Sequence, residues 1–183
     1  MQRHLAAVFV AGFMTVVTVP THAADQPWGE MSSMLDYNKL CIKPDGGLGA
    51  WNGSLVRLVS CGYSTPPDQY DPSYFWSTAY AGQDDDGVYV QFVNQGRLPG
   101  ARLCLDLTNG NGADGTLIQL WECRNTNGQI WHIRNDGTIR NYRSGDCLDV
   151  RTGGSGLIQN WHCGGGDENA AQHWAARNDF QRH

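Results

Sequence analysis

The stretch CLDLTNGNGADGTLIQLWEC, Cys104–Cys123, is written a second time as CLDVRTGGSGLIQNWHC, Cys147–Cys163. Each copy places Cys-Leu-Asp before a glycine-rich segment and closes it with Leu-Ile-Gln-x-Trp-x-Cys. A fainter third copy ends in LVRLVSC at Cys61, and its first cysteine is Cys41. Self-similarity of this kind indicates a repeat architecture. We therefore divide the chain into three repeats, of which the first is the longest.

A short aromatic element follows the closing cysteine of each copy. The three elements are Tyr74–Trp76, Gln129–Trp131 and Gln172–Trp174. A buried indole fills a large volume and needs one hydrogen-bond partner, which suits a position that recurs in every repeat. We expect core roles, and no ligand contacts, for Trp76, Trp131, Trp174, Gln129 and Gln172.

Alternation of apolar and polar side chains predicts short strands in each copy. In the second copy they are Leu103–Leu107, Leu117–Cys123, Gln129–Ile133 and Thr138–Tyr142, with a turn at Asn135–Gly137. The third copy runs out near Asp179, where its fourth strand should begin. We expect Met34–Tyr37, which precedes Cys41, to supply that strand and close the ring. Three repeats of four strands closed in this way form an all-β fold, a β-trefoil.

The composition supports this fold class and excludes some partners. The chain has 183 residues, 23 of them glycine, and a net charge of −5 at pH 7. No amphipathic run of helical length occurs, and glycine suits tight turns between short strands. No basic cluster occurs either, so nucleic acid and anionic membrane surfaces are poor partners. The length fits one domain.

Residues 1–23 have the pattern of a secretory signal peptide. Basic Arg3 precedes the apolar run 5–19, which is too short for a membrane anchor, and small residues flank the expected cleavage point at Thr21–Ala23. We expect an N-terminal extension over residues 24–33, no membrane insertion, and secretion to an extracellular or periplasmic space. All six cysteines follow this segment, and an even number suits an oxidising compartment.

The order Cys-Leu-Asp, Ile-Gln-x-Trp-x-Cys, Gln-x-Trp resembles the ricin B-type lectin domain. That family is a β-trefoil that binds galactose-like sugars in shallow pockets, one in each repeat. The resemblance covers about residues 30–180 and is specific in the second and third repeats. It implies a single domain over residues 34–183, with repeats at about 34–102, 103–145 and 146–180.

The resemblance also implies the sugar-binding residues. A sugar presents an apolar face of C–H groups and a ring of hydroxyls, so its site needs an aromatic ring for stacking and a carboxylate acceptor. The second-repeat pocket would consist of Asp106, Gln119 and Trp121, and the third-repeat pocket of Asp149, Gln159 and Trp161. The glycine-rich loops 109–115 and 153–156 would form the rims. In the alternative, the two aspartates only cap the turns that follow them.

The pockets depart from the family pattern at several positions. The family usually places a donor asparagine just before the Gln-x-Trp glutamine, and here that position holds Gly128 or Ala171. Asn127 lies one residue earlier and is a candidate substitute in the second pocket, and Asn169 is the nearest one in the third. The first repeat has lost the motif, since its Asp, Gln and Trp positions hold Lys43, Arg57 and Val59. We expect no sugar binding there.

The repeats also select a cysteine pairing. Six cysteines allow fifteen pairings, and one pair per repeat gives Cys41 with Cys61, Cys104 with Cys123, and Cys147 with Cys163. Histidines such as His162 and His173 raise the question of zinc, but paired cysteines and the lack of Cys-x2-Cys spacing argue against a metal site. We expect neither a metal nor another cofactor.

Three classes of function remain. The first is a secreted lectin for galactose-type or N-acetylgalactosamine-type glycans. The second is a receptor-binding or accessory subunit of a multi-chain toxin or of a secreted glycosidase. It is favoured by the enlarged first repeat, which holds the acidic run Asp84–Asp86 and the aromatic residues Tyr70, Tyr74, Phe75, Trp76 and Tyr80. The third is an enzyme, and no Gly-x-Ser-x-Gly or His-Glu-x-x-His motif supports it. We expect a lectin.

Overall fold

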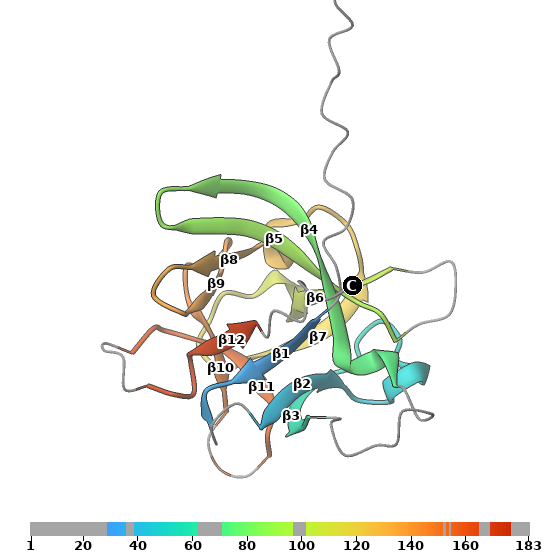
Figure 1. The fold of residues 1–183 in the computed structure, drawn as a ribbon. Coiled ribbons are helices and arrows are strands. Elements are labelled where there is room, and N and C mark those ends of the chain that lie inside the picture. Colours follow the sequence, from blue (N-terminus) through green and yellow to red (C-terminus); the bar gives the residue numbers. More distant parts are fainter. Residues whose placement is uncertain are drawn as a thin grey trace, which may run out of the picture.

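The chain forms a closed arrangement of antiparallel strands in the computed structural model (Figure 1). The structure describes residues 29–35, 39–61, 71–96, 102–151, 153, 155–164 and 169–176. The signal peptide predicted at residues 1–23 lies outside these ranges. Within them, no helix has the length and apolar character needed to cross a bilayer.

The strands are short and joined by tight turns, as the alternating pattern predicts. They are β1 (Gly29–Ser33), β2 (Leu40–Pro44), β3 (Val56–Ser60), β4 (Phe75–Asp84), β5 (Gly87–Asn94), β6 (Leu103–Leu107), β7 (Thr116–Glu122), β8 (Trp131–Arg134), β9 (Ile139–Asn141), β10 (Cys147–Val150), β11 (Ile158–Trp161) and β12 (Trp174–Ala176). Single turns of 3-10 helix occur at Gly47–Gly49, Pro72–Tyr74, Thr108–Gly110 and Asn127–Gln129. The fold is all-β.

Three hairpins with the same register build the barrel. In β2–β3, β6–β7 and β10–β11 the paired positions are Cys41 with Val59, Cys104 with Trp121, and Cys147 with Trp161. Their second strands meet one another in turn, through Leu55 with Gln119, Leu117 with Gln159, and Arg57 with Leu157. Each hairpin therefore contacts both others, and the predicted pseudo-threefold β-trefoil is confirmed.

The N-terminal strand closes the ring, but the position predicted for it was wrong. Strand β1 pairs with β12 through Met31 and Ala176, just as β8 pairs with β9 in the second repeat. The predicted segment was Met34–Tyr37, of which Met34 and Leu35 follow the strand in a turn and the rest lies outside the described residues. The extension assigned to residues 24–33 thus contributes a strand to the fold.

The sequence of β1 explains the error. Its one buried apolar side chain is Met31, and the two residues after it are buried serines. Ser32 Oγ donates to the carbonyl of Ala175 at 3.1 Å, and Ser33 Oγ donates to that of Ala170 at 3.4 Å. Hydrogen bonds from the two serines to the C-terminal segment hold β1 in place. Its sequence therefore lacks the alternation of apolar and polar residues that predicts the other strands.

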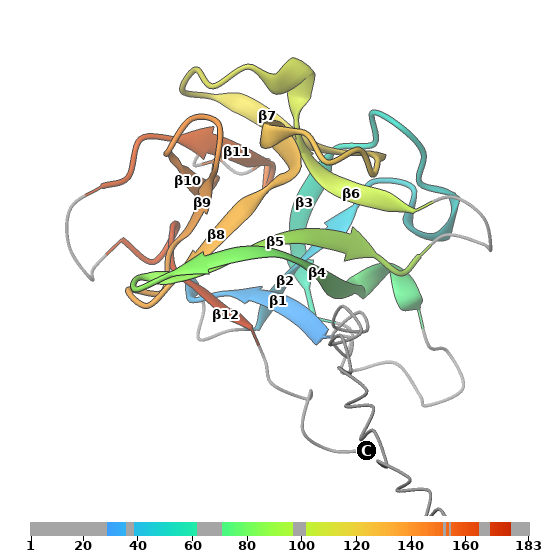
Figure 2. The ribbon, with the colours of Figure 1, turned by 90° about the horizontal axis from the view of Figure 1, so that it is seen from above.

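The hairpin β4–β5 accounts for much of the extra length of the first repeat. It runs past β8 as a long ribbon and pairs with it (Figure 2). At its tip, Asp84 accepts a 2.7 Å hydrogen bond from the Tyr89 hydroxyl and lies 3.1 Å from Nε2 of the buried His132. Asp86 forms an ion pair with Arg134. Two of the three acidic residues are thus engaged with this chain's own side chains.

The aromatic residues of the first repeat do not form one surface. Trp76 is buried in the core, whereas Tyr80 is 59% exposed. The ring of Tyr74 lies under the Lys43 ammonium, 4.4 Å from the ring centroid. Tyr70 lies outside the described residues. The aromatic residues that are close in sequence therefore have separate roles: Trp76 in the core, Tyr74 beside Lys43, and Tyr80 at the surface.

The core confirms the predicted role of the three tryptophans. Each indole Nε1 donates to the carbonyl of the residue that follows the first cysteine of its repeat: Trp76 to Ile42 at 3.2 Å, Trp131 to Leu105 at 3.0 Å, and Trp174 to Leu148 at 2.9 Å. Gln129 and Gln172 are also buried. Each links two segments near the closing cysteine, since Gln129 Nε2 donates to Glu122 O at 2.9 Å and its Oε1 accepts from Arg124 N at 2.6 Å.

The six cysteines form three disulfides, one within each repeat. They are Cys41–Cys61, Cys104–Cys123 and Cys147–Cys163, the pairing that the repeats predict. Each disulfide joins the two strands of one repeat hairpin: β2–β3, β6–β7 or β10–β11. By the chain-entropy argument, a loop of this length stabilises the fold by about 3 kcal/mol.

Candidate functional site

The second repeat places Asp106, Gln119 and Trp121 around one cavity of about 340 Å³. Asp106 on β6 and Gln119 on β7 are cross-strand partners, so their side chains share a face. Gln119 Nε2 donates to Asp106 Oδ1 at 2.9 Å. This bond fixes one carboxylate oxygen of Asp106. Trp121 follows two residues after Gln119 on the same face of β7 and is half-buried.

The third repeat repeats this arrangement. Asp149 on β10 pairs with Gln159 on β11, and Gln159 Nε2 donates to Asp149 Oδ1 at 2.7 Å. Both line a cavity of about 480 Å³ together with Trp161. Trp161 is 37% exposed, so its ring presents a face to solvent, whereas Asp149 is only 7% exposed. The carboxylate thus lies deeper than the surface position that a shallow pocket implies.

Burial raises the pKa of both aspartates above the usual value for this side chain. Hydrogen bonds from Gln119 to Asp106 and from Gln159 to Asp149 oppose this rise but do not cancel it. A carboxylate with one oxygen fixed by a hydrogen bond is a directional acceptor, because its remaining lone pairs can accept from hydroxyl donors.

The glycine-rich loop of the second repeat lies between the two cavities. Its residues Asn109 and Gly110 line the second-repeat cavity, and Gly115 lines the third-repeat cavity. Gly115 has a φ of +82°, and a Cβ there would lie 3.7 Å from Cζ3 of Trp161. Asp114 in the same loop binds His162, whose Nδ1 lies 2.8 Å from Asp114 Oδ2. The predicted rim at 109–115 therefore serves both cavities.

The first repeat carries cations at the equivalent positions. Lys43 and Arg57 are cross-strand partners in the register that pairs aspartate with glutamine elsewhere. Lys43 Nζ lies 2.6 Å from Asp71, and Arg57 Nε lies 2.6 Å from Asp45. With Val59 at the tryptophan position, this site has neither the free carboxylate nor the aromatic ring of the other two.

The residues near the missing asparagines lie as follows. Asn127 is exposed and lines the second-repeat cavity, while the neighbouring Gly128 is buried. Ala171 and Asn169 line the third-repeat cavity. The Asn169 carbonyl accepts from His173 Nδ1 at 2.9 Å. Both candidate substitutes therefore lie at their cavities.

Sequence reasoning missed several lining residues. They are Arg124, Thr126 and Arg143 in the second repeat, and Arg151 and His162 in the third. Gln129 and Gln172, assigned to the core, also reach the cavities from their buried positions. The missed residues lie outside the strands and the shared motif identities, so alignment of the repeats gave no signal for them.

Possible metal ligands meet at one place in the described part of the chain: Glu30, Cys41 and Cys61. Both sulfurs belong to a disulfide. Because the thiolate is the form that binds metal, this grouping lacks the ligands of a metal centre.

Residues 94–183 match the family of ricin-type beta-trefoil lectin domains. The match starts at the end of β5 and contains the second and third repeats, where the motif is complete. Most of the first repeat, including its altered pocket positions Lys43, Arg57 and Val59, lies outside the match.

Two curated proteins share shorter stretches with the chain. Beta-galactoside-specific lectin 2 of Viscum album is 46% identical over 48 residues, which is 25% of this chain and 8% of that protein. Serine protease 1 of Rarobacter faecitabidus is 42% identical over 48 residues, 26% of this chain and 9% of that protein. The matched stretches therefore span only a small part of these relatives.

Among solved structures, the designed threefold symmetric protein ThreeFoil superposes with a TM-score of 0.59 at 19% identity. The superposition covers 80% of this chain and 95% of that one. At this identity the likeness concerns the fold alone, and it agrees with the three equivalent hairpins.

Proposed function

Because residues 94–183 carry a ricin-type β-trefoil lectin domain, we propose that the protein is a secreted lectin that binds galactose-like sugars in its second-repeat and third-repeat pockets. The lectin domain supports carbohydrate binding. The sugar class follows from the resemblance and from the name of the Viscum album relative. The three disulfides support secretion, because disulfides persist in oxidising compartments.

One observation carries the proposal: the same aspartate–glutamine hydrogen bond lies beside a tryptophan in two related cavities. The donor–acceptor distance is 2.9 Å at Asp106 and 2.7 Å at Asp149. A turn cap would be bonded to backbone N–H groups of the following loop. Instead, Asp106 and Asp149 each accept a hydrogen bond from the side chain of the glutamine on the opposite strand. This favours a positioned acceptor over a structural cap.

The expected binding chemistry has two parts. The free lone pairs of Asp106 or Asp149 accept hydrogen bonds from neighbouring sugar hydroxyls. The face of Trp121 or Trp161 packs on the C–H face of the ring. A single shallow site of this kind has a dissociation constant near 1 mM, about 4 kcal/mol. Two sites on one protein then raise retention on multivalent glycans through effective concentration.

The test is titration calorimetry with galactose, lactose and N-acetylgalactosamine. We expect Asp106→Asn and Trp121→Ala to abolish binding at the second site, and Asp149→Asn and Trp161→Ala at the third, because each loses about 1–3 kcal/mol of a weak interaction. Lys43→Ala, at the matching position of the first repeat, is the control. Four variants that bind like the unmodified protein would refute the proposal, provided that all of them keep their melting temperature.

We also propose that the protein is not itself an enzyme and acts as a lectin on its own. The alternative is a subunit of a larger assembly, and one observation favours it. Strand β4 pairs with β1 only at Phe75 and Trp76, so in the described part of the chain its outer edge from Ser77 to Asp84 has no neighbouring strand. Exposed Tyr80 lies on this edge strand. Co-purification of a second chain, lost in Tyr80→Asp, would support the subunit.

A further inference from the structure

Arg143 lies in the turn between β9 and β10 and lines the second-repeat cavity. Its side chain crosses the glycine-rich loop at Gly110, where a Cβ would lie 3.7 Å from Arg143 Nε and 3.9 Å from Cζ. Gly110 has a φ of +61°, which glycine adopts without strain. The bare backbone of the loop thus leaves room for the guanidinium beside the cavity.

The turn that carries Arg143 is fixed to the cavity wall. Asn141 is buried, and its Oδ1 accepts from the backbone N of Arg143 at 3.0 Å. The amide Nδ2 of the same asparagine donates to the carbonyl of Gly128, also at 3.0 Å. Gly128 stands where the family places its donor asparagine. Arg143 is therefore held next to the position at which the usual hydrogen-bond donor is missing.

The charge of Arg143 has no partner within the described ranges. The other arginines of this repeat form ion pairs: Arg124 with Glu122, Arg134 with Asp86 and Asp136, and Arg140 with Asp136. No carboxylate of the described residues pairs with Arg143, which is exposed. In a chain with a net charge of −5, this is an uncompensated cation at a candidate binding cavity.

A second guanidinium lines the same cavity. Arg124 lies 2.8 Å from Glu122, and their side chains are 61% and 56% exposed. An exposed pair of this kind contributes little in water, so Arg124 can exchange its partner for a ligand. The lining of this cavity has two arginines and one aspartate, Asp106.

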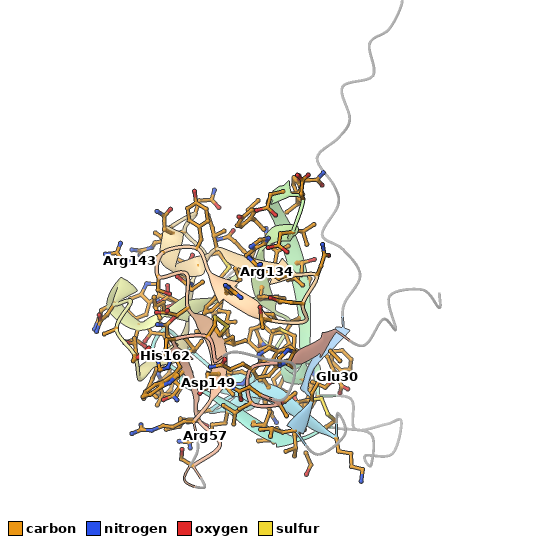
Figure 3. The ribbon with its side chains drawn as sticks, turned by 90° about the vertical axis from the view of Figure 1, so that its left-hand side faces the viewer. Glu30, Arg57, Arg134, Arg143, Asp149 and His162 are labelled. Carbon is orange, nitrogen blue, oxygen red and sulfur yellow. A yellow bond between two sulfur atoms is a disulfide. The ribbon has the colours of Figure 1, made fainter. Side chains whose placement is uncertain are left out.

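The third-repeat cavity has a different balance. It is lined by Asp149 and by Arg151, and its His162 binds the carboxylate of Asp114. The lining of this cavity thus has one arginine and one aspartate, and a second carboxylate, that of Asp114, is bound to the lining His162. Figure 3 shows Arg143 and His162 on one side of the molecule, and the loop that contacts both separates the two cavities.

We propose that the second-repeat pocket takes a sugar that carries an anionic group, a carboxylate or a sulfate ester, and that Arg143 binds this group while Asp106 and Trp121 hold the ring. The proposal rests on the function proposed above and names the ligand class of one of its two sites. The planar guanidinium matches the paired oxygens of such groups. The guanidinium of Arg143 also supplies hydrogen-bond donors in place of the side chain that Gly128 lacks.

The experiment uses Trp161→Ala, which silences the third site, as its background. Lactose, lactose bearing a sialic acid and lactose bearing a sulfate ester are titrated at about 50 mM and about 500 mM salt, because screening at the higher salt weakens exposed ion pairs. We expect an acidic derivative to bind about fivefold more tightly than lactose at the lower salt, as an exposed ion pair gives about 1 kcal/mol. The two derivatives distinguish a carboxylate ligand from a sulfate ligand.

Arg143→Gln should remove this preference for the acidic derivative, and Arg143→Lys should retain part of it. Arg151→Gln, the same substitution in the other pocket, should leave the preference intact. Lactose binding without any preference, or a preference that survives Arg143→Gln, would overturn this inference and leave the lectin proposal standing. Absence of binding by every neutral and acidic sugar to the unmodified protein would overturn both.

Discussion

Asp114 belongs to the second repeat but binds His162 in the pocket of the third. Its carboxylate accepts from the His162 backbone N at 2.6 Å and lies 2.8 Å from Nδ1. These hydrogen bonds hold the pKa of Asp114 below its usual value. His162 follows Trp161, and the two ring centroids are 5.5 Å apart. One pocket thus takes part of its rim from the neighbouring repeat.

Asp114→Asn should therefore weaken the third site and spare the second. The amide keeps the size of the side chain but loses the charge, so it binds His162 less firmly and leaves Trp161 less well positioned. We expect a several-fold loss of sugar affinity in a Trp121→Ala background, where the third site alone is intact. Titration calorimetry measures this loss of affinity. Asp85→Asn, at the hairpin tip, is the charge-matched control, and an equal loss there would contradict the assignment.

Sugar binding should weaken on acidification before the fold does. Burial raises the pKa of Asp106 and Asp149, and a protonated carboxyl is a poorer acceptor for sugar hydroxyls. We expect affinity at both sites to fall on acidification, at a higher pH than the one at which an ordinary aspartate takes up its proton. Titrations at stepped pH, with the melting temperature recorded at each step, measure both quantities.

Protonation of Asp106 and Asp149 should have the opposite effect on the stability of the fold. A carboxyl whose pKa is raised in the folded state is more easily protonated there than in the unfolded chain. Asp106 and Asp149 therefore favour folding as the pH falls. Asp71 behaves differently, because hydrogen bonds from Lys43 and Ser73 outweigh its burial and lower its pKa. Its stabilisation is lost only as the pH falls below the usual carboxyl range. A melting temperature that drops over the same pH range as the sugar affinity would contradict this order.

Substitutions in the first repeat should change stability without changing sugar binding. Lys43→Met removes the ion pair with Asp71 and the contact with the Tyr74 ring. We expect a loss of about 1 kcal/mol, since the pair is only partly screened by solvent. Arg57→Gln should cost less, because its partner Asp45 is more exposed. Denaturant unfolding and glycan titration on the same samples provide the readouts, and a several-fold loss of affinity would show that the first repeat binds sugar.

Two tryptophans of different repeats offer a matched comparison. Trp131→Phe removes the donor to Leu105 O inside the core and should cost about 1–3 kcal/mol in unfolding free energy. The same change at Trp161, which is partly exposed, should leave stability within about 0.5 kcal/mol. It should also retain some sugar affinity, because phenylalanine still stacks. Equal destabilisation of the two variants would place Trp161 in the core.

The repeated identities made most of the fold predictable. Cys104 and Cys147 anchor the register, and a fixed register places each aspartate opposite its glutamine, so pocket residues and disulfides followed from one alignment. Strand β1 has no such anchor, since two buried serines replace the expected apolar residues. The Asp114–His162 contact joins different repeats, and Arg143 lies in a turn. Neither recurs in sequence, so only three-dimensional packing revealed them.

The pairing of β1 with β12 determines when this chain can complete its fold during synthesis. Met31 finds its partner Ala176 only after all three repeats between them have been made. Until then, the edge of β1 that β12 will cover stays open to any other strand. Local hairpins can form as each repeat emerges from the ribosome, but the pairing of β1 with β12 cannot form until β12 has been made. A ribosome that stalls before Trp174 would release a chain in which the hairpins β2–β3, β6–β7 and β10–β11 are complete but the edge of β1 is exposed. Truncated chains of this kind are therefore an expected source of aggregation.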